Sequence, residues 1–506
     1  MKRFALSALI EWKNKPNRKP LVIQGARQVG KTELVRIFAR QEFDSFIEIN
    51  FDEHPKQVSL FDDEDIHNVL RFIEIDTNQR IIPGKTLLFL DEIQSAPSIL
   101  AKLRYFYERL PELHVICAGS LLDFVLAEPE YSMPVGRIEF LYLGPMSFDE
   151  FLLARGQDQL YEYVESYPRS GITMGVDHAK VGAGYTGDSV EYGQHSADAS
   201  NLSAPDSSPA DFRALQFMSI PQVIHSKLLG FLREYFLVGG LPGVVKAYVE
   251  SGLDPLAAGQ EQQSILQTYY LDFGKYRKRV NVSLLQALLK RIPSQVGKTV
   301  KYSALDPLVR SAAVKDSLDL LEKARLIYRV FHSDGNGLPL GAEVNRSYFK
   351  LLFLDTGLFS AFLGLKPSDF LANVDFTLVH SGSVAEQFIG QQLLYANDPW
   401  AEPSLFYWDR PNRSSTAEVD YLISCAGRVV PIEVKAGTIG RLKSLQMFVH
   451  EKDAPIALRF NSGLPSVFVT HTSVAGKEPV PFVLLSLPLY MAQQAPQILS
   501  GILNLV

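Results

Sequence analysis

A glycine-rich octapeptide follows the first apolar segment and constrains the fold of this chain more than any other feature. Residues 25–32 read GARQVGKT, which fits the pattern G-x-x-x-x-G-K-S/T in full. The apolar run LVIQ precedes the octapeptide, and the helix-like run ELVRIFARQ follows it. Because glycines let successive backbone N–H groups curl around one anion at a helix N-terminus, this unit predicts a phosphate-binding loop. The alternative is a glycine-rich turn with a chance lysine.

Short apolar runs alternate with amphipathic stretches from residue 20 to about residue 155. The runs are PLVIQG, SFIEINF, KTLLFLDE, LHVICAGS and RIEFLYLGP. This alternation is typical of a parallel sheet covered by helices on both faces. We therefore expect an α/β fold with a P-loop NTPase core. The chain of 506 residues is too long for one hydrophobic core, so two to four domains are expected.

Bulk properties exclude several classes of protein. The net charge of −6 argues against a general polyanion binder, although a local basic groove is compatible with it. Cys117 and Cys425 lie in apolar runs, which favours buried thiols in a reducing compartment over disulfides or a zinc site. Glu11 and Lys13 interrupt the N-terminal apolar stretch, so it is a poor signal peptide, and no apolar run is long enough to cross a bilayer. We expect a cytoplasmic protein with no membrane partner.

The residue types in the loop have defined roles in phosphate binding. Lys31 supplies a positive charge for the β- and γ-phosphates, and the Thr32 hydroxyl can ligate Mg²⁺. The backbone of the other positions is expected to face the phosphates: Gly25, Ala26, Arg27, Gln28, Val29 and Gly30.

Polar residues after the later apolar runs complete the predicted site. The run TLLFLDE ends in Asp91, a direct or indirect Mg²⁺ partner, and in Glu92, which is placed to polarise the attacking water. Ser120 could sense the γ-phosphate or orient the water; alternatively it is an ordinary loop serine. Arg137 could reach the nucleotide of a neighbouring subunit, which implies a homo-oligomer, or be a surface arginine paired with an acid.

The middle of the chain changes character twice. Residues 167–212 are rich in Gly, Ser, Asp and Pro and lack apolar periodicity, which predicts a mobile insertion. Helical periodicity resumes at residues 224–250, and a later helical block leads to the hairpin signal SDGNG, which is compatible with a winged helix. The candidate recognition helix, AVKDSLDLLEKARL, carries three acidic residues, so a packing or protein-contact role is favoured over DNA binding.

Several motifs together resemble the AAA-type ATPases of the archaeal-ATPase group, over almost the whole chain. The similar segments are RKPLVIQGARQVGKTELV, FLDEIQ, AGSLL, PVGRIEFLYLGPMSFDEF, YFLVGGLPGVV, LLFLDTGL, GSVAEQFI and EVDYL…IEVK. The resemblance implies a protein that binds ATP and hydrolyses it with Mg²⁺. It also implies a C-terminal domain of unknown function. The insertion departs from the family pattern and leaves the geometry of the lid open.

The C-terminal domain of that family resembles the PD-(D/E)XK nuclease fold, which implies a metal site. The matching residues are Glu386 on a helix, Asp420 on a strand, and Glu433 and Lys435 on the next strand. Alternation along a strand puts Glu433 and Lys435 on one face, where Asp420 and Glu433 could share a divalent metal, with Glu386 as a further ligand. Lys435 could then orient the nucleophilic water or neutralise a phosphate. The alternatives are an edge salt bridge between Glu433 and Lys435, and an inactive domain that only binds nucleic acid.

These observations predict five regions: a P-loop core (1–155), the insertion (156–215), a helical lid (216–280), a winged-helix-like block (281–345) and a nuclease-like domain (346–506). The expected function is ATP hydrolysis coupled to a nuclease-like or nucleic-acid-binding domain. The alternative is an ATP-dependent switch that recruits a protein partner and whose C-terminal domain is catalytically inactive.

Overall fold

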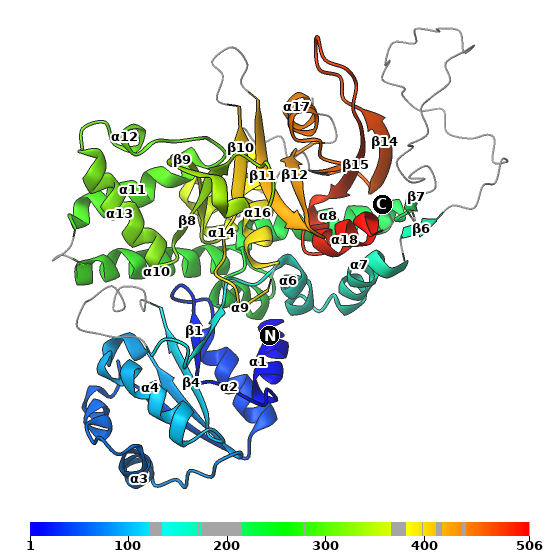
Figure 1. Ribbon diagram of the computed structural model, residues 1–506. Helices are drawn as coiled ribbons and strands as arrows, with labels where there is room; N and C mark the ends of the chain where they lie inside the picture. Colours follow the sequence, from blue (N-terminus) through cyan, green and yellow to red (C-terminus); the bar gives the residue numbers. More distant parts are fainter. Residues whose placement is uncertain are drawn as a thin grey trace, which may run out of the picture.

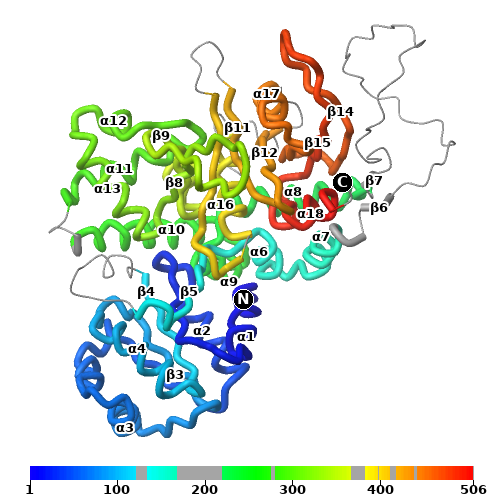
Figure 2. The backbone as a smooth tube through the Cα atoms, viewed as in Figure 1, coloured from blue at the N-terminus to red at the C-terminus, as the bar shows by residue number. Residues whose placement is uncertain are grey.

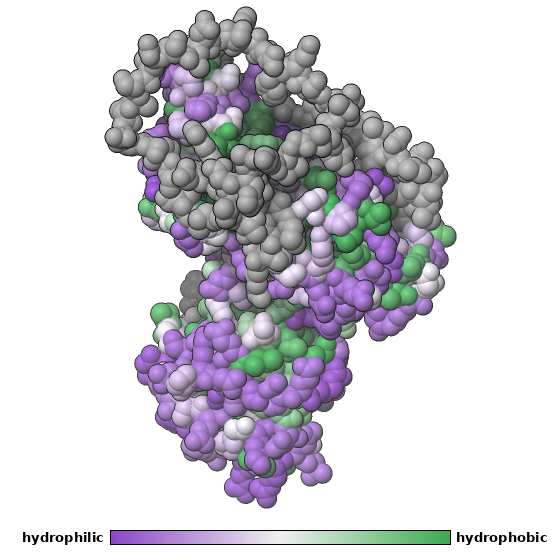
Figure 3. Space-filling view, turned by 90° about the vertical axis from the view of Figure 1, so that its right-hand side faces the viewer, coloured by the Kyte–Doolittle hydropathy of each residue, from purple (hydrophilic) through white to green (hydrophobic). Residues whose placement is uncertain are grey.

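The computed structural model describes residues 1–120, 134–170, 172–174, 215–217, 219–276, 280–365, 381–396, 398–410, 417–437 and 442–504. The described residues form a lower lobe, built from the N-terminal part of the chain, and a larger upper lobe (Figure 1; Figure 2). The space-filling view narrows between the two lobes, and hydrophilic side chains cover most of the visible face of the lower lobe (Figure 3).

A five-stranded parallel sheet forms the centre of the lower lobe. Its strands pair in the order β2-β3-β4-β1-β5, and all four pairings are parallel. The parallel sheet predicted from the alternating apolar runs is confirmed. The strands are β1 (Leu21–Gln24), β2 (Ser45–Asn50), β3 (Thr86–Asp91), β4 (His114–Gly119) and β5 (Glu139–Tyr142).

Helices cover both faces of this sheet, as the fully buried inner strands β1, β3 and β4 require. Alternate residues of one strand enter different cores: Leu87 and Phe89 pack in one cluster, whereas Leu88 and Leu90 pack in the other. Cys117 is buried on β4 and Cys425 is also buried, both as free thiols, as predicted. The helical elements are α1 (Ala5–Lys13), α2 (Lys31–Glu42), η1 (Pro55–Phe61), α3 (Ile66–Thr77), η2 (Ile93–Ser95) and α4 (Ser98–Arg109).

Five helices follow the lower sheet along the chain. They are α6 (Phe148–Ala154), α7 (Asp158–Ser170), α8 (Gln222–Val238), α9 (Pro242–Glu250) and α10 (Pro255–Asp272). In the described part of the chain, no single helix is long and apolar enough to cross a membrane. Helices α8 and α9, which are bent by 116° relative to each other, have the length and composition of a span only when they are taken together.

The predicted insertion lies mostly outside the described residues. Helix α7 extends to Ser170 and so includes the first positions of the segment 167–212. Two short strands, β6 (Ile172–Met174) and β7 (Leu215–Phe217), pair with each other on either side of residues 175–214, which are not described.

Three helices and a β-hairpin lie in the segment where a winged helix is expected. The helices are α11 (Val282–Arg291), α12 (Tyr302–Leu305) and α13 (Ser311–Lys323), and the hairpin strands are β8 (Ile327–Ser333) and β9 (Val344–Phe353). The SDGNG segment connects β8 to β9, and Val300 adds an antiparallel bridge to Phe349 of β9.

The hairpin belongs to the same sheet as the C-terminal domain. The eight strands pair in the order β14-β15-β13-β12-β11-β10-β8-β9, and β8 pairs in parallel with β10. The domain boundary expected between residues 345 and 346 therefore falls inside a continuous sheet. The remaining elements are α14 (Thr356–Phe362), α16 (Ser381–Tyr395), β10 (Phe406–Asp409), β11 (Glu418–Cys425), β12 (Arg428–Val434), α17 (Lys443–Lys452), β13 (Ile456–Asn461), β14 (Ser466–His471), β15 (Pro481–Pro488) and α18 (Ala495–Leu503).

Candidate functional sites

The predicted phosphate loop lies between the end of β1 and the start of α2. A Cβ atom on Gly25 would lie 2.3 Å from the carbonyl oxygen of Leu143, so only glycine fits at that position. Gly30 has a φ of 89° at the N-cap of α2, and Gln28 also adopts a positive φ of 70°. These left-handed conformations turn the backbone sharply at the helix N-terminus, where partial positive charge favours an anion.

Lys31 is buried within the loop that it belongs to. Its Nζ donates hydrogen bonds to the carbonyl oxygens of Gly25 (3.0 Å) and Ala26 (2.8 Å). Burial lowers the pKa of Lys31 to about 8, and the nearby carboxylates of Glu92 and Asp91 oppose this shift. The ammonium group therefore lies inside the loop, bonded to neutral carbonyls that a phosphate could replace.

Thr32 and Asp91 meet at the adjacent ends of two elements. The Thr32 hydroxyl donates to Asp91 Oδ2 over 2.9 Å, which joins the start of α2 to the end of β3. Burial raises the pKa of Asp91 to about 6, although the hydrogen bond from Thr32 opposes the shift. A hydroxyl and a carboxylate in contact are an oxygen donor set that Mg²⁺ prefers.

Glu92 and Ser120 lie at the ends of neighbouring strands, as expected from their positions after β3 and β4. Glu92 has a φ of 52°, and its carboxylate accepts a hydrogen bond from the side chain of Gln94. The left-handed backbone of a non-glycine residue is typical of functional sites. Ser120 is buried, and its hydroxyl has no hydrogen-bond partner among the described residues.

Contacts from distant parts of the chain hold the loop, and sequence reasoning missed all of them. Arg27 pairs with Asp272 of α10 (Nε to Oδ2, 3.0 Å), and the hydroxyl of Tyr269, also on α10, donates to the carbonyl oxygen of Arg27 (2.9 Å). The Arg27 pair has the geometry of an ion pair and not of a hydrogen bond.

Two further arginines bind next to the loop. Arg3 donates to the carbonyl oxygen of Val29 (2.8 Å). Arg325, in the turn between α13 and β8, donates to the side-chain oxygen of Gln24 at the end of β1 (3.2 Å). No local pattern marks these residues, because their partners lie far away in the sequence.

Arg137 lies away from the loop of its own chain. The parallel pairing of β1 with β5 matches Leu21 to Glu139 and Gln24 to Tyr142, so Arg137 lies beyond the opposite end of these strands from the loop. Its guanidinium pairs with Glu108 (2.8 Å) and is partly exposed.

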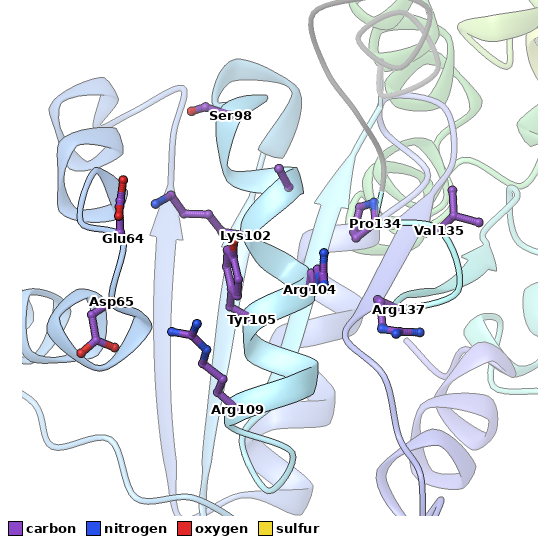
Figure 4. A pocket seen from close by; sticks show the side chains of 11 residues that line it. Glu64, Asp65, Ser98, Lys102, Arg104, Tyr105, Arg109, Pro134, Val135 and Arg137 are labelled. Atoms are coloured by element: carbon purple, nitrogen blue, oxygen red, sulfur yellow. The ribbon is translucent and has the colours of Figure 1, made fainter.

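Arg137 also lines a cavity of about 980 Å³ beside α4 (Figure 4). Four of the residues that line this cavity are basic, and two are acidic. The charged residues are Lys102, Arg104, Arg109, Arg137, Glu64 and Asp65.

The residues predicted for the C-terminal site do converge. Asp420 on β11 accepts a hydrogen bond from the backbone of Val434 on β12 (2.8 Å), and Lys435 bonds to Glu433. Glu433 is 5% exposed, and one of its oxygens, Oε2, has no hydrogen-bond partner among the described residues. Burial and then the charge of Asp420 raise the pKa of Glu433 to about 8, and burial raises the pKa of Glu386 to about 7.

Two residues that the sequence did not indicate join this group. Lys350 of β9 is buried, and its Nζ lies 2.6 Å from Glu418, 2.9 Å from Glu386 and 3.2 Å from Asp420. Burial lowers the pKa of Lys350, but the three carboxylates raise it, and the net result is well above its ordinary value. Among the described residues, no group of three His, Cys, Asp or Glu side chains could hold a metal ion.

Three family models match consecutive parts of the chain. Residues 17–152 match an AAA domain. Residues 230–369 and 381–481 match two domains of unknown function, designated DUF8612 and DUF4143. A search of curated proteins found no match.

Similar solved structures include three nucleotide-binding or motor proteins. A Walker-type ATPase of Pyrococcus abyssi is 15% identical, covers 72% of this chain and 95% of its own, and has a TM-score of 0.41. The ORC2 protein of Aeropyrum pernix is 16% identical, covers 32% of this chain and 53% of its own, and has a TM-score of 0.19. The RuvB branch migration motor of Thermotoga maritima is 13% identical, covers 67% of this chain and 90% of its own, and has a TM-score of 0.24.

The family match and the sheet topology agree on the N-terminal lobe. Residues 17–152 match an AAA domain, and the described strands among them form the parallel sheet of a P-loop NTPase core. The predicted fold class, a P-loop core followed by a mixed α/β region, is confirmed.

Proposed function

We propose that this chain binds ATP with Mg²⁺ at residues 25–32, hydrolyses it, and transmits the nucleotide state to its upper lobe. The observation that carries the proposal is the contact between the Thr32 hydroxyl and the Asp91 carboxylate, directly beside the buried Lys31. This places two oxygen ligands suited to Mg²⁺ next to a cation suited to phosphates.

Each residue of the site has a role in this proposal. The loop amides and Lys31 hold the phosphates, and Thr32 and Asp91 hold Mg²⁺, which neutralises phosphate charge when bound. Glu92 orients and polarises the water that attacks the γ-phosphate. The Ser120 hydroxyl, which has no hydrogen-bond partner among the described residues, contacts that phosphate or the water in this proposal.

Coupling to the upper lobe follows the contacts that hold the loop. A phosphate bound at the loop changes the electrostatic environment of Arg27, whose partner Asp272 ends helix α10. Figure 1 shows α10 between the lower lobe and the helices α11 and α13. Arg325 supplies a second path, because it connects the winged block to Gln24 of β1. A lid that changes position with nucleotide state is thereby connected to the C-terminal sheet.

Two substitutions test the proposal. In Glu92→Gln, ATP affinity stays within the error of the wild type while turnover falls roughly 10²–10⁴-fold, because the general base is lost. In Lys31→Ala, affinity for a fluorescent ATP analogue falls about 10–100-fold, the size of a lost charged hydrogen bond. Glu11→Gln, on the exposed face of α1, is the control and changes neither quantity. Failure of the wild type to bind ATP in the presence of Mg²⁺ would refute the proposal.

Metal-dependent cleavage of nucleic acid is the second candidate function. The convergence of Asp420, Glu433 and Lys435, with one Glu433 oxygen unpaired in the described structure, favours it. Lys350 opposes it, since its ammonium contacts the carboxylates that would bind the metal. Incubation of the full chain with labelled DNA and RNA, Mn²⁺ and ATP decides between a nuclease and a switch with an inactive C-terminal domain. Cleavage that is lost in Glu433→Ala supports the nuclease. No cleavage by the wild type supports the switch.

A further inference from the structure

Lys350 is a buried cation at the centre of a group of carboxylates. It comes from β9, the outer strand of the hairpin, whereas Glu386 comes from α16 and both Glu418 and Asp420 come from one face of β11. Helix α16 contacts both β9 and β12, which brings these elements together around the lysine. The group is therefore assembled from three separate segments of the upper lobe.

The ammonium group has one carboxylate neighbour for each of its N–H donors, and these neighbours have the opposite charge. An ammonium has three N–H donors, and Nζ of Lys350 lies within 3.2 Å of one oxygen from each of three carboxylates: Glu386 Oε1, Glu418 Oε1 and Asp420 Oδ1. The Lys350 side chain is 2% exposed and those of Glu386 and Asp420 are 12% and 15% exposed, so water screens these two pairs little. A buried charge with this set of partners is stable only while all of them are present.

Lys350 contacts two of the three acids whose pattern predicts a metal site. These acids are Glu386, Asp420 and Glu433, and the lysine bonds to one oxygen of Glu386 and one oxygen of Asp420. A divalent ion bound to the same two oxygens would lie beside a fixed positive charge, which repels it.

We propose that Lys350 is a built-in substitute for a divalent cation, so that the C-terminal carboxylate group neither binds Mg²⁺ or Mn²⁺ nor cleaves phosphodiesters. The lysine instead acts as a fixed internal ion that ties the winged hairpin to the C-terminal domain. This inference does not depend on ATP hydrolysis in the lower lobe, so each can fail without the other.

Removal of the lysine tests the proposal by creating a metal site. Every protein is the full chain and carries Asp91→Asn, so that metal binding at the phosphate loop is not counted, and Mn²⁺ is titrated without nucleotide by calorimetry. Lys350→Ala gains one Mn²⁺ site per chain that binds at least about tenfold tighter than any site in the Lys350 parent. The matched control, Lys350→Ala with Asp420→Asn, loses this gain.

Thermal denaturation gives a second readout, on a variant that keeps more of the side-chain volume than alanine does. Lys350→Met keeps most of the side-chain volume and leaves the carboxylates without a counter-ion, so Mn²⁺ raises its unfolding temperature by several degrees but leaves that of the Lys350 parent unchanged. If the lysine variants fold only with Mn²⁺ present, the proposal is supported.

Three results would overturn it. In the first, the Lys350 parent binds Mn²⁺ at a site that Asp420→Asn or Glu433→Gln abolishes. In the second, the lysine variants gain no Mn²⁺ site. In the third, both lysine variants fail to fold and Mn²⁺ does not restore folding. This result would count against the proposal, because a position suited to a cation would accept the metal in place of the lysine.

Discussion

Asp91 carries a charge that the folded chain disfavours when no cation is bound. Burial raises its pKa from an ordinary 3.8 to about 6. Between these two values the folded chain retains a proton that the unfolded chain has released, so the free energy of unfolding falls as the pH rises through this window. The total cost above pH 6 is about 3 kcal/mol, at 1.36 kcal/mol per pKa unit. A bound cation would remove this cost.

Asp91→Asn should therefore stabilise the nucleotide-free protein at pH 8, and less so at pH 5. The asparagine still accepts a hydrogen bond from Thr32 but cannot ionise, so it avoids the cost of a buried charge. The measurement is the difference in unfolding temperature between the variant and the wild type at the two pH values, without metal. Asp44→Asn, at an exposed carboxylate, is the control and should show no such pH dependence. A variant less stable than the wild type at pH 8 would contradict the assignment.

At the scale of elements, a glycine turn between α8 and α9 joins segments that are far apart in the sequence. The backbone N–H of Gly240 donates to the buried Asp355 (2.7 Å), and its carbonyl accepts from the backbone of Met146 (2.6 Å). A Cβ atom on Gly240 would lie 2.1 Å from the carbonyl oxygen of Met146. The motifs GPMS, VGGLPG and LFLDTG therefore meet at one point between the lobes.

Gly240→Ala should lower the stability of the chain by about 1–3 kcal/mol, because the added methyl group must displace backbone. Gly230→Ala is the matched control: this glycine lies inside α8 with open space at its Cβ position, and alanine there should be neutral or stabilise by about 0.5–1 kcal/mol. Denaturant-induced unfolding of both variants measures the difference. Equal stability of the two variants would show that the close approach at Gly240 is relieved at no cost.

Helix α10 is the element that we expect to respond to nucleotide. In Asp272→Asn, the ion pair between α10 and the Arg27 side chain is lost, whereas the side-chain volume and the hydrogen bond from Tyr269 to Arg27 are kept. Hydrogen exchange across residues 255–272 should then respond to ATP by roughly half the wild-type amount or less, since local opening follows the contacts that hold the helix. Lys246→Ala on α9, which removes an exposed pair with Glu250, is the control. An unchanged response in Asp272→Asn would assign the coupling to another path, such as Arg325.

At the scale of the whole molecule, the Arg137 guanidinium lies outside the site of its own chain, so any role in hydrolysis requires a second chain. We expect Arg137→Ala to reduce turnover roughly 10³-fold or more without weakening ATP binding, the effect of losing an arginine that stabilises transition-state charge. Lys31→Ala should be inactive for a different reason, because its own loop no longer holds ATP.

Mixing these two inactive variants tests the assembly. Some shared sites would combine an intact Lys31 from one chain with an intact Arg137 from another, so turnover should reappear in the mixture. Arg104→Ala, beside Arg137 on the same cavity, is the control and should retain turnover. If Arg137→Ala hydrolyses ATP at the wild-type rate, Arg137 is a surface arginine paired with Glu108.

The parts of this protein that could be predicted from the sequence are those that depend on neighbours along the chain. The phosphate loop is one strand, one turn and one helix, so its glycines, Lys31 and Thr32 are recognisable in a single stretch. The three inner strands of the lower sheet, β1, β3 and β4, are mostly apolar because both of their faces are buried. The acidic and basic pattern at Asp420, Glu433 and Lys435 is also local, and these residues do lie together.

The tertiary structure decided what depends on residues far apart in the chain. Lys350 is an ordinary lysine in an apolar strand until folding places three carboxylates around it, and Arg325 is an ordinary turn residue until it meets Gln24, 301 positions away. The continuity of the β8–β9 hairpin with the C-terminal sheet likewise required the pairing of β8 with β10, which no local pattern encodes. Periodicity and turn chemistry act over a few residues, whereas charge compensation and strand order are settled only when the whole chain is packed.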